Sequence, residues 1–303
     1  MNCSLDPGKV AEFSKAFSAT GRIWEARDGL CIDYPALDKK PFDAIMFFTK
    51  YAHERPFTNP RHPIAHRISI LKAIGVSDAK DPSANDKFAA KYCEPGFAEK
   101  VWDEFALLMK IADKHKETRK TIEKYTQGPV QTILEKLKEA EQPSIVALLT
   151  SKPLEEAYRF LKKIDGISHK IAALFLRDVS CSFGGWDKPE RRHFYCLQPV
   201  DRWVRVVAER CWENIAGIKD VEKVAKAIVE CCRVQGIDPI DFNKGAWFLG
   251  ANFQKLCGFF RIDTTMRLPD LNTRAIEKFD LAELERAIET LGRAKSPERI
   301  YPL

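Results

Sequence analysis

Apolar residues recur along this chain at the three- and four-residue spacing of amphipathic helices. The clearest example is the stretch 95–124, whose apolar positions are Phe97, Val101, Trp102, Phe105, Leu108 and Ile111. Similar spacing predicts helices over residues 7–19, 41–53, 63–74, 128–140, 144–149, 154–164, 169–179, 200–211, 221–235 and 242–256. One or two more are expected between residues 267 and 303. The pattern therefore predicts an all-α fold.

Polar and proline-rich stretches separate these helices. Residues 55–63 hold three prolines and are predicted to form a loop, and residues 81–85 form a polar break. Residues 23–34 contain Asp28 and Gly29 between short alternating runs, a pattern that fits either a small β-hairpin or an irregular loop. Residues 180–198 are too long for an ordinary connector and mix basic with aromatic side chains, which is typical of a functional or mobile segment.

The stretch 161–170, with the sequence LKKIDGISHK, organises the rest of the chain. It joins the helix predicted over 154–164 to the one predicted over 169–179, so it must form a very short turn. Gly166 allows the positive φ that such a turn needs. The backbone N–H groups of residues 166–170 then lie near a helix start, where a phosphate binds favourably. The turn by itself is equally typical of an ordinary corner between two helices.

A second feature lies downstream, in the sequence PVDRW at residues 199–203. Asp201 stands where the N-cap of the helix predicted over 200–211 belongs. A lysine near one helix start and an aspartate at another form a pair with chemical meaning, because a neutral amine is a nucleophile and a carboxylate stabilises positive charge. A plain N-cap is the alternative interpretation of Asp201.

The sequence IDGISHKIA at 164–172, followed by PVDR at 199–202, resembles the helix-hairpin-helix DNA glycosylase superfamily. Within it, the archaeal-type 8-oxoguanine DNA glycosylase/AP lyases are the most similar group. The family pattern is a glycine-rich hairpin that ends in lysine, then a Val-Asp pair at the next helix start. The resemblance implies that Lys170 is the catalytic lysine and Asp201 the catalytic aspartate. Ser168 replaces the second hairpin glycine, and Trp203 replaces a histidine that often follows the Val-Asp pair.

Two further segments resemble the archaeal-type family and imply a base pocket. The sequence EKVWDEF at 99–105 is similar to a segment that carries a base-stacking tryptophan, and WFLG at 247–250 is similar to a second one. The resemblance implies that Trp102 and Trp247 stack on the damaged base once it has left the duplex. Core packing is the alternative for each tryptophan. The sequence EARD at 25–28 is also similar to that family, although Leu30 stands where the family places a base-reading glutamine.

The resemblance implies two helical lobes with a helix-hairpin-helix motif at the cleft between them. One lobe is expected over residues 60–180 and the other from residues 1–59 with 195–303. The residues expected to hold the DNA backbone are Asp165, Gly166, Ile167, Ser168 and His169. The hairpin carbonyls are compatible with a structural monovalent cation, and no other cofactor is implied.

The activity that the resemblance implies is that of a bifunctional DNA glycosylase and AP lyase in base excision repair. Such an enzyme removes an oxidised base, in the first instance 8-oxoguanine, through a lysine Schiff base. A glycosylase for an oxidised pyrimidine or another lesion is one alternative. A helix-hairpin-helix DNA-binding protein without chemistry is another, and the pairing of Lys170 with Asp201 argues against it because a binding protein needs neither residue.

Charge permits nucleic-acid binding without demanding it. The chain has 303 residues, a formal net charge of +6 and a pI of about 8.7. Basic residues exceed acidic ones over residues 110–124 and 152–205, although such stretches are also typical of a solvated helix face. The expected partner is double-stranded DNA that contains a damaged base, bound by a monomer.

Targeting signals and metal motifs are not evident in the sequence. Residues 1–10 contain no apolar run of a signal peptide, and the longest apolar runs are too short to span a bilayer. We therefore expect a protein of the cytoplasm and nucleoid, or of the nucleus in a eukaryote. Nine scattered cysteines suggest free thiols. Cys231, Cys232 and Cys257 fit neither an iron–sulfur loop nor a zinc site, so no metal cluster is expected.

Overall fold

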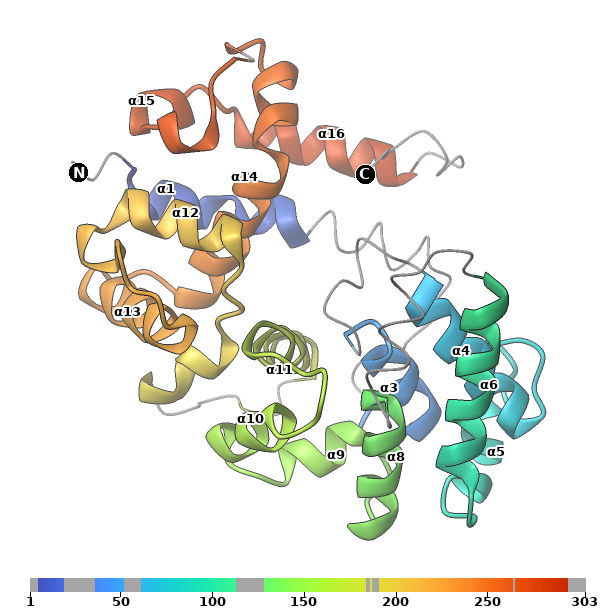
Figure 1. Cartoon of the computed structure of the whole chain (residues 1–303). Helices are drawn as coiled ribbons and strands as arrows, with labels where there is room; N and C mark the ends of the chain where they lie inside the picture. Colours follow the sequence, from blue (N-terminus) through green and yellow to red (C-terminus); the bar gives the residue numbers. More distant parts are fainter. Residues whose placement is uncertain are drawn as a thin grey trace. The chain divides into compact units, whose positions relative to one another are not determined.

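The computed structural model describes residues 5–18, 36–51, 61–112, 128–183, 186, 191–263 and 265–293 (Figure 1). Every regular element in these ranges is a helix, and these ranges contain no strand. The prediction of an all-α fold is therefore confirmed. The β-hairpin or loop predicted over 23–34 and most of the loop predicted over 55–63 lie outside the described residues.

The chain divides into two compact units. The first, called the terminal unit below, comprises Met1–Cys31 and Glu190–Leu303, and the second, the central unit, comprises Ile32–Pro189. The division expected from the resemblance, 60–180 against 1–59 with 195–303, differs at its first boundary. The reason is that helix α3 (Pro41–Phe48) packs against helices of the central unit, at α5 (Ala84–Lys91) and α9 (Ile145–Thr150).

The central unit is built around aromatic side chains. Its other described helices are α4 (Arg61–Ile74), α6 (Phe97–Ala112), α8 (Pro129–Glu139), α10 (Leu154–Lys162) and α11 (His169–Phe183). Helices α4 and α6 lie side by side (Figure 1). Phe175 of α11 packs against Phe47, Phe48 and Tyr51 at ring-centroid distances of 5.1–5.6 Å. This packing fixes α11, the helix that carries Lys170, to α3.

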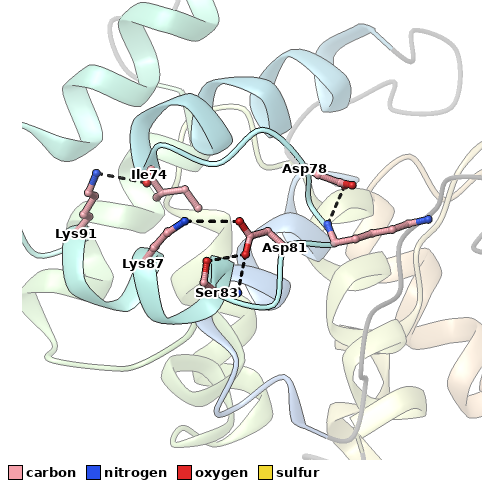
Figure 2. A network of polar contacts seen from close by, with 7 residues as sticks. Ile74, Asp78, Asp81, Ser83, Lys87 and Lys91 are labelled. Carbon is pink, nitrogen blue, oxygen red and sulfur yellow. Dashed lines mark hydrogen bonds and ion pairs between the residues drawn. The ribbon is translucent and has the colours of Figure 1, made fainter.

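Helix α5 is absent from the sequence prediction, because residues 81–85 look like a polar break. Figure 2 shows Asp81 and Ser83 in the turn that directly precedes this helix. Asp81 Oδ1 accepts hydrogen bonds from the Ser83 amide at 2.8 Å and from the Ser83 hydroxyl at 2.6 Å, and Lys87 Nζ lies 3.6 Å from Asp81 Oδ2. The bonds from Ser83 lower the pKa of Asp81. These bonds order the turn that leads into α5, a helix that has little apolar periodicity.

The terminal unit is arranged around its longest helix, α14 (Pro239–Phe259). Its other described elements are α1 (Pro7–Glu12), η2 (Arg191–Leu197), α12 (Arg202–Cys211), η3 (Glu213–Ile215), α13 (Val221–Val234), η4 (Leu268–Asp270), α15 (Thr273–Ile276) and α16 (Leu281–Arg293). Helix α14 packs against α1, α12 and α13 (Figure 1). It begins three residues before the predicted start, because Asp238 caps it and Pro239 occupies its first turn.

Two glycines let α14 approach its neighbours closely. A Cβ on Gly245 would lie 1.9 Å from the carbonyl oxygen of Val10 in α1. A Cβ on Gly250 would lie 2.7 Å from Cβ of Trp203 in α12. Because neither glycine has a side chain, the three helices pack with almost direct backbone contact.

None of the helices in the described part of the chain is both long enough and apolar enough for a membrane crossing.

Candidate functional site

The turn between α10 and α11 has the form that its glycine predicts. Helix α10 ends at Lys162 and α11 begins at His169, and Gly166 between them has a φ of 86°. The Ile167 amide donates to the Ile164 carbonyl at 3.0 Å, which closes the turn. The side chains of Ile164 and Ile167 are both buried and anchor the turn to the core of the central unit.

Ser168, which departs from the glycine-rich family pattern, occupies the N-cap position of α11. Its carbonyl accepts a hydrogen bond from the Ala172 amide at 3.0 Å, and its hydroxyl accepts one from the Ile171 amide at 3.4 Å. A glycine at this position supplies no side-chain acceptor. The serine therefore adds a helix cap to the hairpin at the place where the family pattern has conformational freedom.

The hydrogen bonds of the turn bear on the predicted phosphate contact. The Ile167 amide is engaged with Ile164, so a phosphate at this amide would compete with the bond that closes the turn. The roles predicted for Asp165, Gly166, Ser168 and His169 in DNA binding stay predictions, as does the monovalent cation at the hairpin carbonyls.

The side chain of His169 points into the protein. Its Nδ1 lies 2.6 Å from the hydroxyl oxygen of Tyr158 in α10, and the two rings meet edge to face at 5.7 Å. Both side chains are buried. Lys162 Nζ lies 6.0 Å from the centre of the Tyr158 ring. The bond joins the first residue of α11 directly to α10, one residue before Lys170.

Lys170 and Asp201 belong to different units. Lys170 is the second residue of α11 in the central unit, and its side chain is half-buried. Asp201 lies in the terminal unit, where it is confirmed as the N-cap of α12. Its Oδ1 accepts hydrogen bonds from the amides of Trp203 and Val204 at 2.9 and 3.0 Å. Both capping bonds therefore use one oxygen of the carboxylate.

The backbone that leads into Asp201 is held by a residue that the sequence pattern does not single out. Asn243 of α14 is fully buried, and its Nδ2 donates to the Pro199 carbonyl at 3.2 Å. An asparagine within an apolar helix face is a weak signal in one sequence. Its partner is 44 residues away along the chain, so no local pattern predicts the contact.

The two tryptophans predicted for the base pocket both pack against protein. The Trp102 ring lies 5.4 Å from that of Phe105 and covers Gly128, where a Cβ would come within 2.3 Å of its Cζ3. The Trp247 ring meets Phe17 edge to face at 5.6 Å. Both tryptophans are half-buried, one in the central unit and one in the terminal unit. Core packing thus accounts for part of each ring, and their contact with a base stays a prediction.

Trp203 stands where the family often has histidine, and it is paired with its neighbour. The guanidinium carbon of Arg202 lies 4.0 Å from the centre of the Trp203 ring. Arg202 is exposed, whereas Trp203 is half-buried. The stacked pair forms the first turn of α12, directly after Asp201.

Other predicted features lie partly beyond the described residues. The segment 25–28, Leu30 and most of the basic run over 110–124 fall outside them. In the segment 180–198, Trp186 Nε1 donates to the Lys152 carbonyl at 3.1 Å, and Lys226 Nζ of α13 lies 4.5 Å from the centre of the Tyr195 ring. No group of three or more metal-ligating side chains gathers within the described ranges. The absence of a metal cluster stays a prediction.

No model of a known protein family matches the chain, and no solved structure matches it significantly. The resemblance to the helix-hairpin-helix glycosylases therefore rests on the residues quoted above.

Proposed function

We propose that the chain is a bifunctional DNA glycosylase and AP lyase that removes an oxidised base, in the first instance 8-oxoguanine, from double-stranded DNA. The observation that carries the proposal is the position of Lys170. This lysine lies on the first turn of a helix that follows a tight, glycine-dependent turn. Asp201, the carboxylate that the same chemistry requires, caps the first helix after η2 and is half-buried.

In this reaction the neutral amine of Lys170 attacks C1′ of the damaged nucleotide. The C1′–N bond breaks, and its electron pair leaves with the base, which takes up a proton. The Asp201 carboxylate stabilises the positive charge that develops on the sugar. Opening of the sugar ring gives a protonated Schiff base. Loss of a C2′ proton then expels the 3′ phosphate, which cuts the strand, and water finally releases Lys170.

Borohydride trapping tests the lysine and the substrate together. Duplexes that each carry 8-oxoguanine, an oxidised pyrimidine or an abasic site are incubated with the protein and borohydride, which reduces the Schiff base to a stable amine. We expect a covalent complex on the 8-oxoguanine and abasic duplexes, and we expect Lys170→Gln to abolish it. Lys163→Gln is the matched control, because Lys163 is an exposed lysine at the end of α10 in the same hairpin.

The outcomes separate the alternatives. Full trapping by Lys170→Gln would place the nucleophile elsewhere and overturn the assignment. Trapping on the oxidised pyrimidine but not on 8-oxoguanine would change the substrate and keep the chemistry. Duplex binding without any trapping would identify a DNA-binding protein that has no lyase chemistry.

A further inference from the structure

The first turn of α12 carries an ordered cation that the reaction above does not use. The guanidinium carbon of Arg202 lies 4.0 Å from the centre of the Trp203 ring, which places the planar cation over the aromatic face. Cation–π contacts at exposed positions are weakly favourable. The contact therefore favours one placement of an arginine that is otherwise exposed to solvent.

The ring under Arg202 is itself fixed by the protein. The Trp203 amide donates to Asp201 Oδ1 at 2.9 Å. The base of the Trp203 side chain packs onto Gly250 of α14, so closely that a Cβ on this glycine would lie 2.7 Å from Trp203 Cβ and 3.3 Å from its Cγ. The chain of contacts therefore runs from α14 through Trp203 to the guanidinium of Arg202.

The N–H donors at the edge of the Arg202 guanidinium are available to a ligand. Among the residues that the structure describes, no carboxylate forms an ion pair with Arg202. Other arginines are engaged: Arg233 with Glu230 at 2.5 Å, and Arg205 with the Ile218 carbonyl at 2.6 Å. Because the ring covers one face of the Arg202 guanidinium, its N–H fork is available edge-on, the geometry that suits a phosphate oxygen pair.

We propose that Arg202, held by Trp203, binds a phosphodiester of the DNA strand that carries the damaged nucleotide. The inference rests on the proposed function, because it takes the neighbouring residue, Asp201, to act at C1′ of that nucleotide. A sugar in a DNA strand is flanked by two phosphates, so a cation next to this carboxylate meets the backbone rather than the base. Arg202 covers one face of the Trp203 ring. In this proposal Trp203 therefore positions the arginine and does not stack on a base through that face.

The salt dependence of binding tests this assignment. Affinity for an undamaged duplex and for a duplex with a tetrahydrofuran abasic analogue is measured over a range of salt concentrations. Each phosphate contact contributes about 0.9 to the slope of log K against log salt. We expect Arg202→Ala to reduce the slope by about that amount on both duplexes. Arg202→Lys should keep the slope and still weaken binding, because it keeps the charge but loses the planar fork.

Two further variants control for charge and for the ring. Arg233→Ala removes one positive charge from an exposed arginine of the same unit that is already paired with Glu230, so it should leave the slope unchanged. Trp203→Leu keeps Arg202 and removes the surface that orders it, so binding should weaken while the slope stays the same. Thermal melting of each variant shows whether the fold is retained.

Each result decides the matter. Equal slopes for Arg202→Ala and Arg233→Ala would overturn the phosphate contact, even if borohydride trapping by the unaltered chain supports the proposed function. Failure of the unaltered chain both to bind duplex and to be trapped would overturn the proposed function and this inference together. A loss of affinity in Arg202→Ala with no change of slope on the abasic duplex would contradict a phosphate contact, because the loss of such a contact lowers the slope.

Discussion

Asp201 has a structural role that the structure establishes and a catalytic role that is proposed, and two substitutions separate them. Both capping bonds end on Oδ1, so the amide oxygen of an asparagine can accept both. We expect Asp201→Asn to keep the melting temperature and to lower single-turnover base release by orders of magnitude, because the negative charge is lost. Asp201→Ala should also lower stability by about 1 kcal/mol. Normal base release by the asparagine variant would leave Asp201 as a helix cap alone.

The hydrogen bond between Tyr158 and His169 allows the contribution of a single bond in the hairpin to the stability of the protein to be measured. Removal of a partner from a buried bond costs about 1–3 kcal/mol, more than at a hydrated site. We expect Tyr158→Phe to lower the free energy of unfolding by this amount, measured by urea denaturation, because the bond to His169 is 2.6 Å long and buried. Tyr92→Phe is the control, since the Tyr92 hydroxyl donates to the Gln142 carbonyl at a half-buried site. Equal losses of unfolding free energy in both variants would show that the buried bond to His169 stabilises the protein no more than the half-buried bond of Tyr92.

The chemical features of the hairpin and of Asp201 depend on near neighbours, which explains why the sequence predicts them. A positive φ at Gly166 and an N-cap at Asp201 follow from the residue type and the few residues around it. The contacts that position these residues do not. Asn243 reaches Pro199 and Gly250 packs on Trp203, and both contacts join residues more than forty positions apart. Periodicity within one window contains no information about them.

At the scale of elements, the three glycines of α14 differ in the space around them, so alanine at each position should change the stability differently. We expect Gly245→Ala to destabilise the protein strongly, because the new methyl group would lie 1.9 Å from a backbone oxygen that cannot move aside cheaply. Gly250→Ala should destabilise it less, since its nearest neighbour, Cβ of Trp203, would lie at 2.7 Å instead of 1.9 Å. Gly258→Ala should raise the melting temperature, because nothing lies within 4 Å of its added Cβ and alanine is favoured over glycine in a helix by about 1 kcal/mol.

Thermal melting of the three variants checks the order. If Gly245→Ala melts at the same temperature as the unaltered chain, α1 does not cross α14 at the distance described. If Gly258→Ala lowers the melting temperature, the space described around Gly258 is not open to an added methyl group.

Helices with sustained apolar spacing were the predictable part of the fold, and short or polar helices were not. Helix α13 is predicted to within one residue, because its buried positions Val224, Ala225, Ile228 and Cys232 follow the helical repeat. Helix α5 is missed, because only Ala84 and Phe88 are buried in eight residues. Asn85, the second residue of α5, is used by another helix, since its Oδ1 accepts hydrogen bonds from the first amides of α3, including that of Phe42 at 3.1 Å. Such a contact between helices has no signature in the sequence of either one.

At the scale of the whole molecule, the segments before and after the central unit lie in one unit. The Leu5 amide donates to the Arg210 carbonyl at 3.3 Å, and Arg210 Nη2 donates to the Leu271 carbonyl at 3.4 Å. The segment before the central unit and the segment after it are therefore joined by these bonds and by the packing of α1 and α12 against α14. Because Lys170 and Asp201 belong to different units, the proposed reaction requires that both units fold.

Each unit also contains a weak acid whose pKa is raised by burial, so we expect the stability of the protein to depend on pH in alkali. In the terminal unit, burial, with smaller contributions from the charges of Cys231 and Asp238, raises the pKa of Cys232 to about 12. In the central unit, burial and the neighbouring Cys93 raise the pKa of Tyr92 to about 12. The unfolded chain ionises these groups nearer their ordinary values of 9.0 and 10.0. The folded state therefore binds more protons than the unfolded state between these values and about pH 12.

The sign of the pH dependence follows from this difference. A group whose pKa is raised by folding stabilises the fold fully below its ordinary pKa, and the stabilisation is lost as the pH rises toward the folded value. We expect the melting temperature to fall steadily from about pH 9 upward. Cys232→Ala should flatten the first part of this fall and Tyr92→Phe the part above pH 10, each compared with its own melting temperature at pH 8. Cys181→Ala, at an exposed cysteine of α11, should leave the curve unchanged. Curves for Cys232→Ala and Tyr92→Phe that superimpose on that of the unaltered chain would show that neither acid contributes to alkaline unfolding.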